Sequence, residues 1–139
     1  MVTDRRGIPL VAGVTGAERP DEGVFAALID AIPPVKGRRG RPRRRPGKLH
    51  ADKGYDVGHC RRYLQRRGIR CRIARKGVED KARLGRHRWV IERTLAWLHR
   101  YKRLRVREER SADIHQALLD LGCALICFKR VQALRQRRE

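Results

Sequence analysis

The sequence has no run of apolar residues long enough to cross a membrane. Its first ten residues, MVTDRRGIPL, contain no hydrophobic signal core. The longest mostly apolar run, ALLDLGCALICF, carries Asp120 and is shorter than the roughly 20 residues that a bilayer-spanning helix needs. We therefore expect a cytoplasmic protein without membrane contacts.

Cysteine pairs at metal-binding spacing are also absent. The four cysteines are Cys60, Cys71, Cys123 and Cys127. None forms a Cys-x-x-Cys pair, which argues against a zinc site, and a disulfide framework is not expected in the cytosol. We expect these residues to be small, half-buried side chains. The sequence also shows no internal repeat and no recognisable helix-turn-helix.

Acidic residues are scarce. The 139 residues include 15 Asp and Glu against 36 Lys and Arg, which gives a formal charge of +21. Such a charge favours a polyanionic partner, and nucleic acid is the first candidate. Arginine outnumbers lysine, which suits bidentate contacts with phosphates. The length is enough for one domain with a modest core.

Apolar periodicity predicts an α/β fold in which strands and helices alternate. Strands are expected at residues 10–14, paired as a hairpin with residues 1–3, and at 48–51 and 69–75, and helices at 19–34, 56–68, 86–104 and 111–138. We expect the strands that contain Lys48 and Arg70 to pair in parallel. Predicted helix N-caps are Asp21, Asp56, and either Ser111 or Asp113. Residues 76–85 are expected to be a polar connector.

The last predicted helix carries an apolar face. This face includes Ile114, Leu118, Leu121, Leu125 and Phe128.

A basic loop is predicted at about residues 35–48. Eight basic residues lie between Lys36 and Lys48, with no acid and with Gly and Pro interspersed, so this stretch cannot build a core and is expected to be mobile. It is either a solvated linker or a phosphate-binding segment, and we favour the second.

Two carboxylates stand where chemistry could occur. Asp52 directly follows the strand at residues 48–51, and functional groups gather at the carboxyl ends of strands in open α/β sheets. It could equally be a turn residue. Glu92 lies in an otherwise apolar helical run, four residues after Arg88. It could form an ion pair with Arg88 or bind a metal ion, and spacing alone does not separate these alternatives.

A family resemblance bears on this choice. The segments LHADKGYD and RHRWVIERTLAWLHRYKRLRVREE, with RGIPL and VTGAERPDE before them, resemble the C-terminal half of bacterial insertion-sequence DDE transposases of the insertion-sequence four and five superfamily. The resemblance implies an RNase H-like fold. It implies that Asp52 and Glu92 bind Mg²⁺ or Mn²⁺, that Arg88 acts beside Glu92, and that the enzyme cleaves and joins DNA strands by two-metal phosphoryl transfer.

The DNA-binding residues that we expect are basic residues of the loop and of the later helices. They are Arg38, Arg39, Arg41, Arg43, Arg44, Arg45, Lys53, Arg100, Lys102 and Arg103. The resemblance implies insertion-sequence ends and target DNA as partners, with the protein associated with the nucleoid when bound. It also suggests an upstream-frame transposase half or a second copy of the chain as partner.

The sequence also departs from the family pattern. Gly85 and His99 replace the Tyr and Lys of the family's Tyr-x2-Arg-x3-Glu-x6-Lys signature. The family's first catalytic Asp lies on a first strand upstream of RGIPL, whereas Asp4 is expected to be a turn residue. We therefore expect an RNase H-like fold truncated at its N-terminus and lacking its first strand, with long C-terminal helices, which leaves the strand at residues 48–51 without a partner on one side.

Residues 1–139 would then form a partial catalytic domain that is inactive alone. The alternatives are a non-catalytic basic nucleic-acid-binding protein and a remnant that does not fold.

Overall fold

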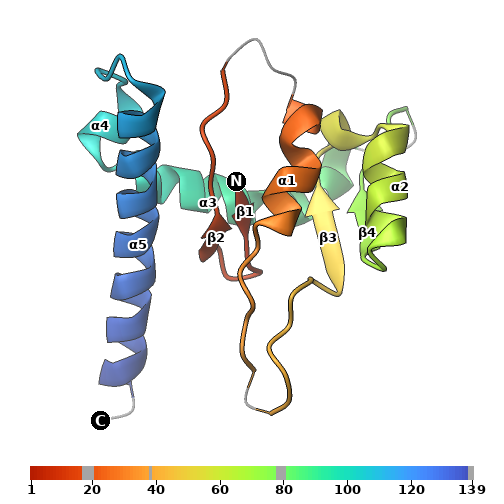
Figure 1. The fold of residues 1–139 in the computed structure, drawn as a ribbon, viewed down its shortest axis with the longest axis horizontal. Coiled ribbons are helices and arrows are strands. Elements are labelled where there is room, and N and C mark those ends of the chain that lie inside the picture. Colours follow the sequence, from red (N-terminus) through yellow and green to blue (C-terminus); the bar gives the residue numbers. More distant parts are fainter. Residues whose placement is uncertain (17–20, 38, 78–80, 138–139) are drawn as a thin grey trace. The chain divides into compact units, whose positions relative to one another are not determined.

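The computed structural model describes residues 1–16, 21–37, 39–77 and 81–137. It shows a mixed α/β protein with short strands and a long C-terminal helix (Figure 1). The chain divides into two compact units, residues 15–89 and residues 1–14 with 90–139, and each is described by itself. No helix among the described residues is long and apolar enough to cross a membrane.

The unit of residues 15–89 is built on two parallel strands. β3 (Lys48–Ala51) pairs with β4 (Arg70–Ile73), with Lys48 level with Arg70, which confirms the predicted parallel pairing. Within the described part of the chain these strands form a two-stranded sheet, so the second edge of β3 has no strand beside it. This agrees with the expectation that the strand lacks a neighbour on one side.

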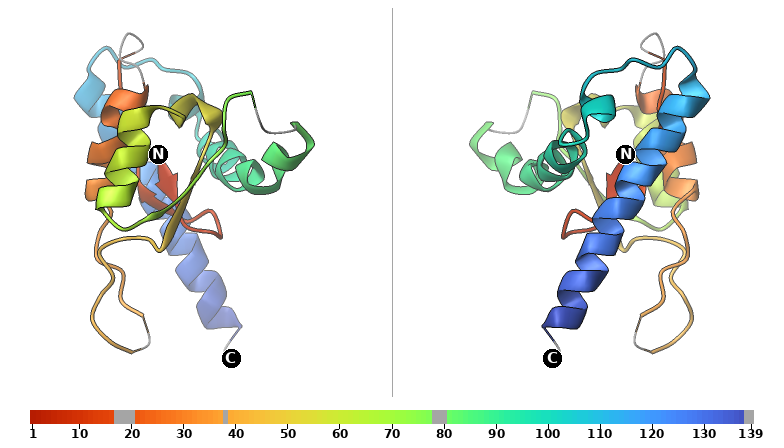
Figure 2. Two further views of the ribbon diagram at one scale, coloured as in Figure 1. Left: turned by 90° about the vertical axis from the view of Figure 1, so that its right-hand side faces the viewer. Right: turned by 90° about the vertical axis from the view of Figure 1, so that its left-hand side faces the viewer.

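Two helices pack on the same side of this strand pair (Figure 2). A 3₁₀ turn, η1 (Asp21–Val24), leads into α1 (Phe25–Asp30), and α2 (Gly58–Arg66) connects the strands. Apolar side chains from these elements form the core of the unit. They are Phe25, Ile29, Ile32, Cys60, Leu64, Ile69 and Ile73.

Two predicted N-caps in this unit are wrong. Val24 precedes α1, because the chain first makes a 3₁₀ turn at the position where Asp21 was expected to cap the helix. Val57 precedes α2, because a second 3₁₀ turn, η2 (Lys53–Tyr55), ends at Asp56. Gly68 ends α2 as expected, with a positive φ of 60° that suits glycine.

The other unit contains a hairpin and the C-terminal helices. β1 (Val2–Thr3) pairs antiparallel with β2 (Pro9–Val11), which confirms the predicted hairpin. Asp4 is the turn residue that was expected, since its Oδ1 accepts hydrogen bonds of 2.8 Å from the backbone N–H groups of Arg6 and Ile8.

The helix expected at residues 86–104 starts earlier and is interrupted. α3 (Lys81–Leu98) begins within the predicted polar connector, and α4 (Lys102–Arg105) follows after a turn. The buried Thr94 hydroxyl donates to the carbonyl oxygen of Gly7 at 2.7 Å, which ties the second half of α3 to the hairpin turn.

The last helix, α5 (Ala112–Gln136), is preceded by Ser111 as predicted. Its buried residues are Gly122 and Ile126. A Cβ on Gly122 would lie 2.8 Å from Leu104 Cδ1 and 3.0 Å from Leu98 Cδ2, so glycine permits this close approach. On the apolar face identified in the sequence, Ile114, Leu121, Leu125 and Phe128 are exposed and Leu118 is half-buried.

Candidate metal and nucleic-acid site

Asp52 stands at the carboxyl end of β3. Its backbone is extended, and its Oδ1 accepts a 2.7 Å hydrogen bond from the Lys53 N–H, so the carboxylate caps the short turn η2. Asp52 therefore has the turn role that the sequence allowed. The side chain is 43% exposed, and a carboxylate with one backbone hydrogen bond can still accept a further ligand.

Arg88 lies beside this carboxylate. Its Nη1 is 3.7 Å from Asp52 Oδ2, although the two residues are far apart in the sequence and both side chains are largely exposed. The structure thus places Arg88 within ion-pair distance of Asp52, a partner that the sequence did not suggest. A guanidinium at this position attracts phosphate, but as a surface pair with Asp52 it adds at most about 1 kcal/mol to stability.

Asp56 has a different role from Asp52. Its Oδ1 accepts from Arg61 Nε at 2.6 Å, and its Oδ2 accepts from the Lys76 N–H at 2.8 Å. Arg61 Nη2 also donates to the carbonyl oxygen of Ile73 at 3.0 Å. Asp56 and Arg61 therefore hold the end of β4 to the start of α2, which explains this acid without any metal ion or helix cap.

The Asp56 carboxylate should make the stability of this unit depend on pH. The Lys76 N–H and then Arg61 lower its pKa from the ordinary value of 3.8. Its stabilising effect is therefore fully present above about pH 4 and is lost as the pH falls through the lowered pKa. We expect Asp56→Asn to be less stable than the wild type near pH 6, with a difference that shrinks below about pH 4.

Urea titrations of both proteins across this pH range measure that difference. Glu108→Gln is a suitable control, because Glu108 is exposed and its carboxylate lies 3.6 Å from Lys102 Nζ in a surface pair. A constant difference between wild type and Asp56→Asn at all pH values would contradict the prediction.

Glu92 lies on α3 in the unit that contains residues 90–139, and its side chain is exposed. Asp52 belongs to the other unit. Among the described residues, no three His, Cys, Asp or Glu side chains gather into a metal-binding group. An exposed carboxylate oxygen is nevertheless a ligand that suits Mg²⁺, which is commonly held by one or two carboxylates together with water and substrate phosphates.

The basic loop closes on itself at its base. Val35 and Arg43 exchange two backbone hydrogen bonds of 2.9 Å each. The described arginines of this loop are all exposed. They are Arg39, Arg41, Arg43, Arg44 and Arg45. Arg38 lies outside the described residues.

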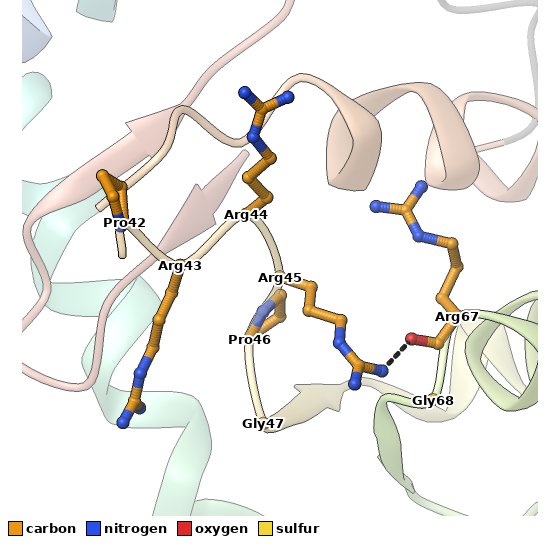
Figure 3. A pocket seen from close by; sticks show the side chains of 8 residues that line it. All are labelled: Pro42, Arg43, Arg44, Arg45, Pro46, Gly47, Arg67 and Gly68. Carbon is orange, nitrogen blue, oxygen red and sulfur yellow. Dashed lines mark hydrogen bonds between the residues drawn. The ribbon is translucent and has the colours of Figure 1, made fainter. Parts of the chain in front are cut away.

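A pocket of about 480 Å³ opens where this loop meets the end of α2 (Figure 3). Arg45 Nη1 donates to the carbonyl oxygen of Arg67, whereas Arg43 and Arg44 point away from that bond. The guanidinium of Arg67 is paired with Asp30. Arg67 was not among the predicted site residues, because the loop and the end of α2 are separated in sequence and meet only in the fold.

The remaining predicted DNA-binding residues have different surroundings. Lys53 and Arg100 are exposed, and Lys102 pairs with Glu108 at the surface. Arg103 Nε donates at 2.6 Å to Glu109, whose side chain is only 2% exposed.

Glu109 also lies near His115, whose Nδ1 is 3.7 Å from Glu109 Oε2. Burial raises the pKa of Glu109, but its backbone hydrogen bond and Arg103 outweigh this and lower the pKa overall. Arg103 is therefore engaged in an ion pair that ties α4 to the segment leading into α5.

Comparisons with known proteins give a family for the chain. The family described as "Transposase DDE domain" matches residues 1–127. A protein of Burkholderia cepacia described as "Putative transposase for insertion sequence element IS402" is 53% identical over 128 residues, which cover 92% of this chain. The matched region spans 61% of the length of that relative. No solved structure matches the chain.

Proposed function

The chain belongs to the family of proteins with a transposase DDE domain, and we propose that it forms part of an insertion-sequence transposase. In this proposal Asp52 and Glu92 bind a divalent metal ion, and the basic loop binds DNA. The observation that carries the proposal is the position of Asp52, which is an exposed acid at the carboxyl end of β3 with Arg88 beside it.

The proposed metal site uses Mg²⁺ or Mn²⁺. When bound, such ions activate the attacking water or 3′-hydroxyl and stabilise the leaving oxygen. Asp52 is held for this role by the Lys53 N–H, which restricts the orientation of its carboxylate. Arg88 would attract the scissile phosphate toward Asp52.

We propose that β3 and β4 belong to an RNase H-like sheet. The parallel register of the two strands, with α2 as the connection between them, is compatible with such a sheet. In this arrangement a further strand would pair with the second edge of β3. A strand from an upstream transposase segment would satisfy the backbone groups there and bring the first Asp of the family pattern close to Asp52.

Metal binding is the experiment that tests the site. We expect the purified chain to bind Mn²⁺, measured by electron paramagnetic resonance, and we expect Asp52→Asn or Glu92→Gln to weaken that binding by about tenfold or more. Glu108→Gln removes an exposed carboxylate outside the proposed site and should leave Mn²⁺ affinity unchanged. Equal Mn²⁺ affinity in all of these proteins would exclude the proposed ligands.

The isolated chain should bind DNA without cleaving it. Two carboxylates are proposed as ligands, and the described residues offer no cluster with a third. A cleavage assay with insertion-sequence ends and Mg²⁺ or Mn²⁺ should therefore show intact strands. Robust strand cleavage that Asp52→Ala abolishes would show that the chain is a complete enzyme and would contradict the proposed inactivity.

A non-catalytic nucleic-acid-binding protein is the second candidate function. The formal charge of +21 and the arginines around the loop pocket favour it. Such a protein would bind DNA equally well with or without a divalent metal ion, and neither Asp52→Asn nor Glu92→Gln would change its metal affinity.

A further inference from the structure

One side of α5 carries large apolar residues that remain partly exposed to solvent. Ile114, Leu121, Leu125 and Phe128 are between 37% and 59% exposed, and Leu118 beside them is half-buried. We call these five residues the outer seam. The helix packs on its own unit through a neighbouring stripe that contains Gly122 and Ile126.

The outer seam has the spacing of a coiled-coil interface. Its members follow one another at intervals of four, three, four and three residues, from Ile114 to Phe128. This interval keeps apolar side chains facing a neighbouring helix over several turns. The spacing therefore indicates that the occupant of the seam is another long helix.

Charge along α5 indicates the direction of that helix. The first half carries Asp113 and Asp120 and no Lys or Arg, whereas the second half carries Lys129, Arg130 and Arg135 and no acid. Two copies of α5 in antiparallel orientation would bring acidic halves against basic halves and would also oppose their helix dipoles. In a parallel pair, like charges would lie together.

We propose that α5 binds α5 of a second copy of this chain as an antiparallel helix pair. Aligning the two outer seams with opposite directions places Leu118 opposite Phe128 of the second copy and Leu121 opposite its Leu125. The two-fold symmetry repeats each of these contacts, which gives four apolar layers. In the same alignment Asp113 of one copy lies close to Arg135 of the other.

The oligomeric state of the full chain tests this interface. We expect sedimentation to give a dimer, with twice the 16.2 kDa mass of the chain, at about 0.5 M salt, where repulsion between the basic chains is screened. Leu121→Glu should give a monomer, because it introduces charge into two central layers. Leu134→Glu is the matched control, because Leu134 is 52% exposed against 57% for Leu121 but lies outside the seam.

Both substitutions are at exposed sites, and circular dichroism will show that helix content is retained. A monomeric wild-type chain would overturn the proposal. Another part of the chain or a different protein would then cover the outer seam. A dimer that resists Leu121→Glu, or that Leu134→Glu disrupts equally, would also overturn it, because its interface would then lie elsewhere.

Charge exchange tests the antiparallel direction. At about 0.15 M salt, Asp113→Arg or Arg135→Glu alone should weaken the dimer by about twofold to thirtyfold, since each puts like charges together at two symmetry-related positions. The double variant should recover most of the wild-type affinity. In a parallel pair Asp113 would face its own copy, so Asp113→Arg would leave affinity unchanged and the double variant would restore nothing.

Discussion

Replacing Arg43, Arg44 and Arg45 with glutamine should lower the affinity for duplex DNA by roughly two orders of magnitude at about 0.1 M salt. Each phosphate contact releases condensed counterions and contributes about 0.9 to the slope of log affinity against log salt. Loss of three contacts should therefore also reduce the steepness of that salt dependence by up to about 2.7. Fluorescence anisotropy with a labelled duplex at several salt concentrations measures both quantities.

The control for this prediction must lose the same charge elsewhere. Arg105, Arg110 and Arg137 are exposed and lie in the unit of residues 90–139. Substituting all three with glutamine should reduce the DNA affinity and the slope of its salt dependence much less. If the loop binds DNA, these three residues contribute only through the net charge. Equal losses in the two triple variants would show that DNA binding depends on overall charge and not on the loop.

The second large effect concerns the core of the unit of residues 15–89. Leu64→Ala should reduce the free energy of unfolding by about 2–5 kcal/mol, which is a large part of the 5–15 kcal/mol typical of a whole domain. The Leu64 side chain is fully buried on α2, so truncation removes apolar contacts and leaves a cavity. Urea denaturation followed by circular dichroism measures the change.

Leu134→Ala provides the comparison for this substitution. Leu134 is exposed on α5, so the same truncation should change stability by no more than about 0.5 kcal/mol. A cooperative transition in the wild type would also exclude an unfolded remnant. If Leu64→Ala were as stable as Leu134→Ala, α2 would not pack through Leu64 as the structure shows.

The amino-acid sequence by itself determined the features that depend on local pattern. Apolar spacing was enough to predict the hairpin, the parallel pair β3 and β4, and the helices between and after them. Gly68 marks the end of α2 because a positive φ favours glycine, and the excess of arginine indicates a nucleic-acid partner. The family could be identified from four segments together, which are LHADKGYD, RHRWVIERTLAWLHRYKRLRVREE, RGIPL and VTGAERPDE.

The tertiary structure decided which distant groups meet. Asp56 looked like a helix cap, but hydrogen bonds from Arg61 and Lys76 give it a role at the end of β4, and no local pattern reports such contacts. Arg88 meets Asp52 for the same reason. The apolar face of α5 shows the limit most clearly. Periodicity identifies a face that avoids water, but only the three-dimensional arrangement shows which side of the helix the chain itself covers.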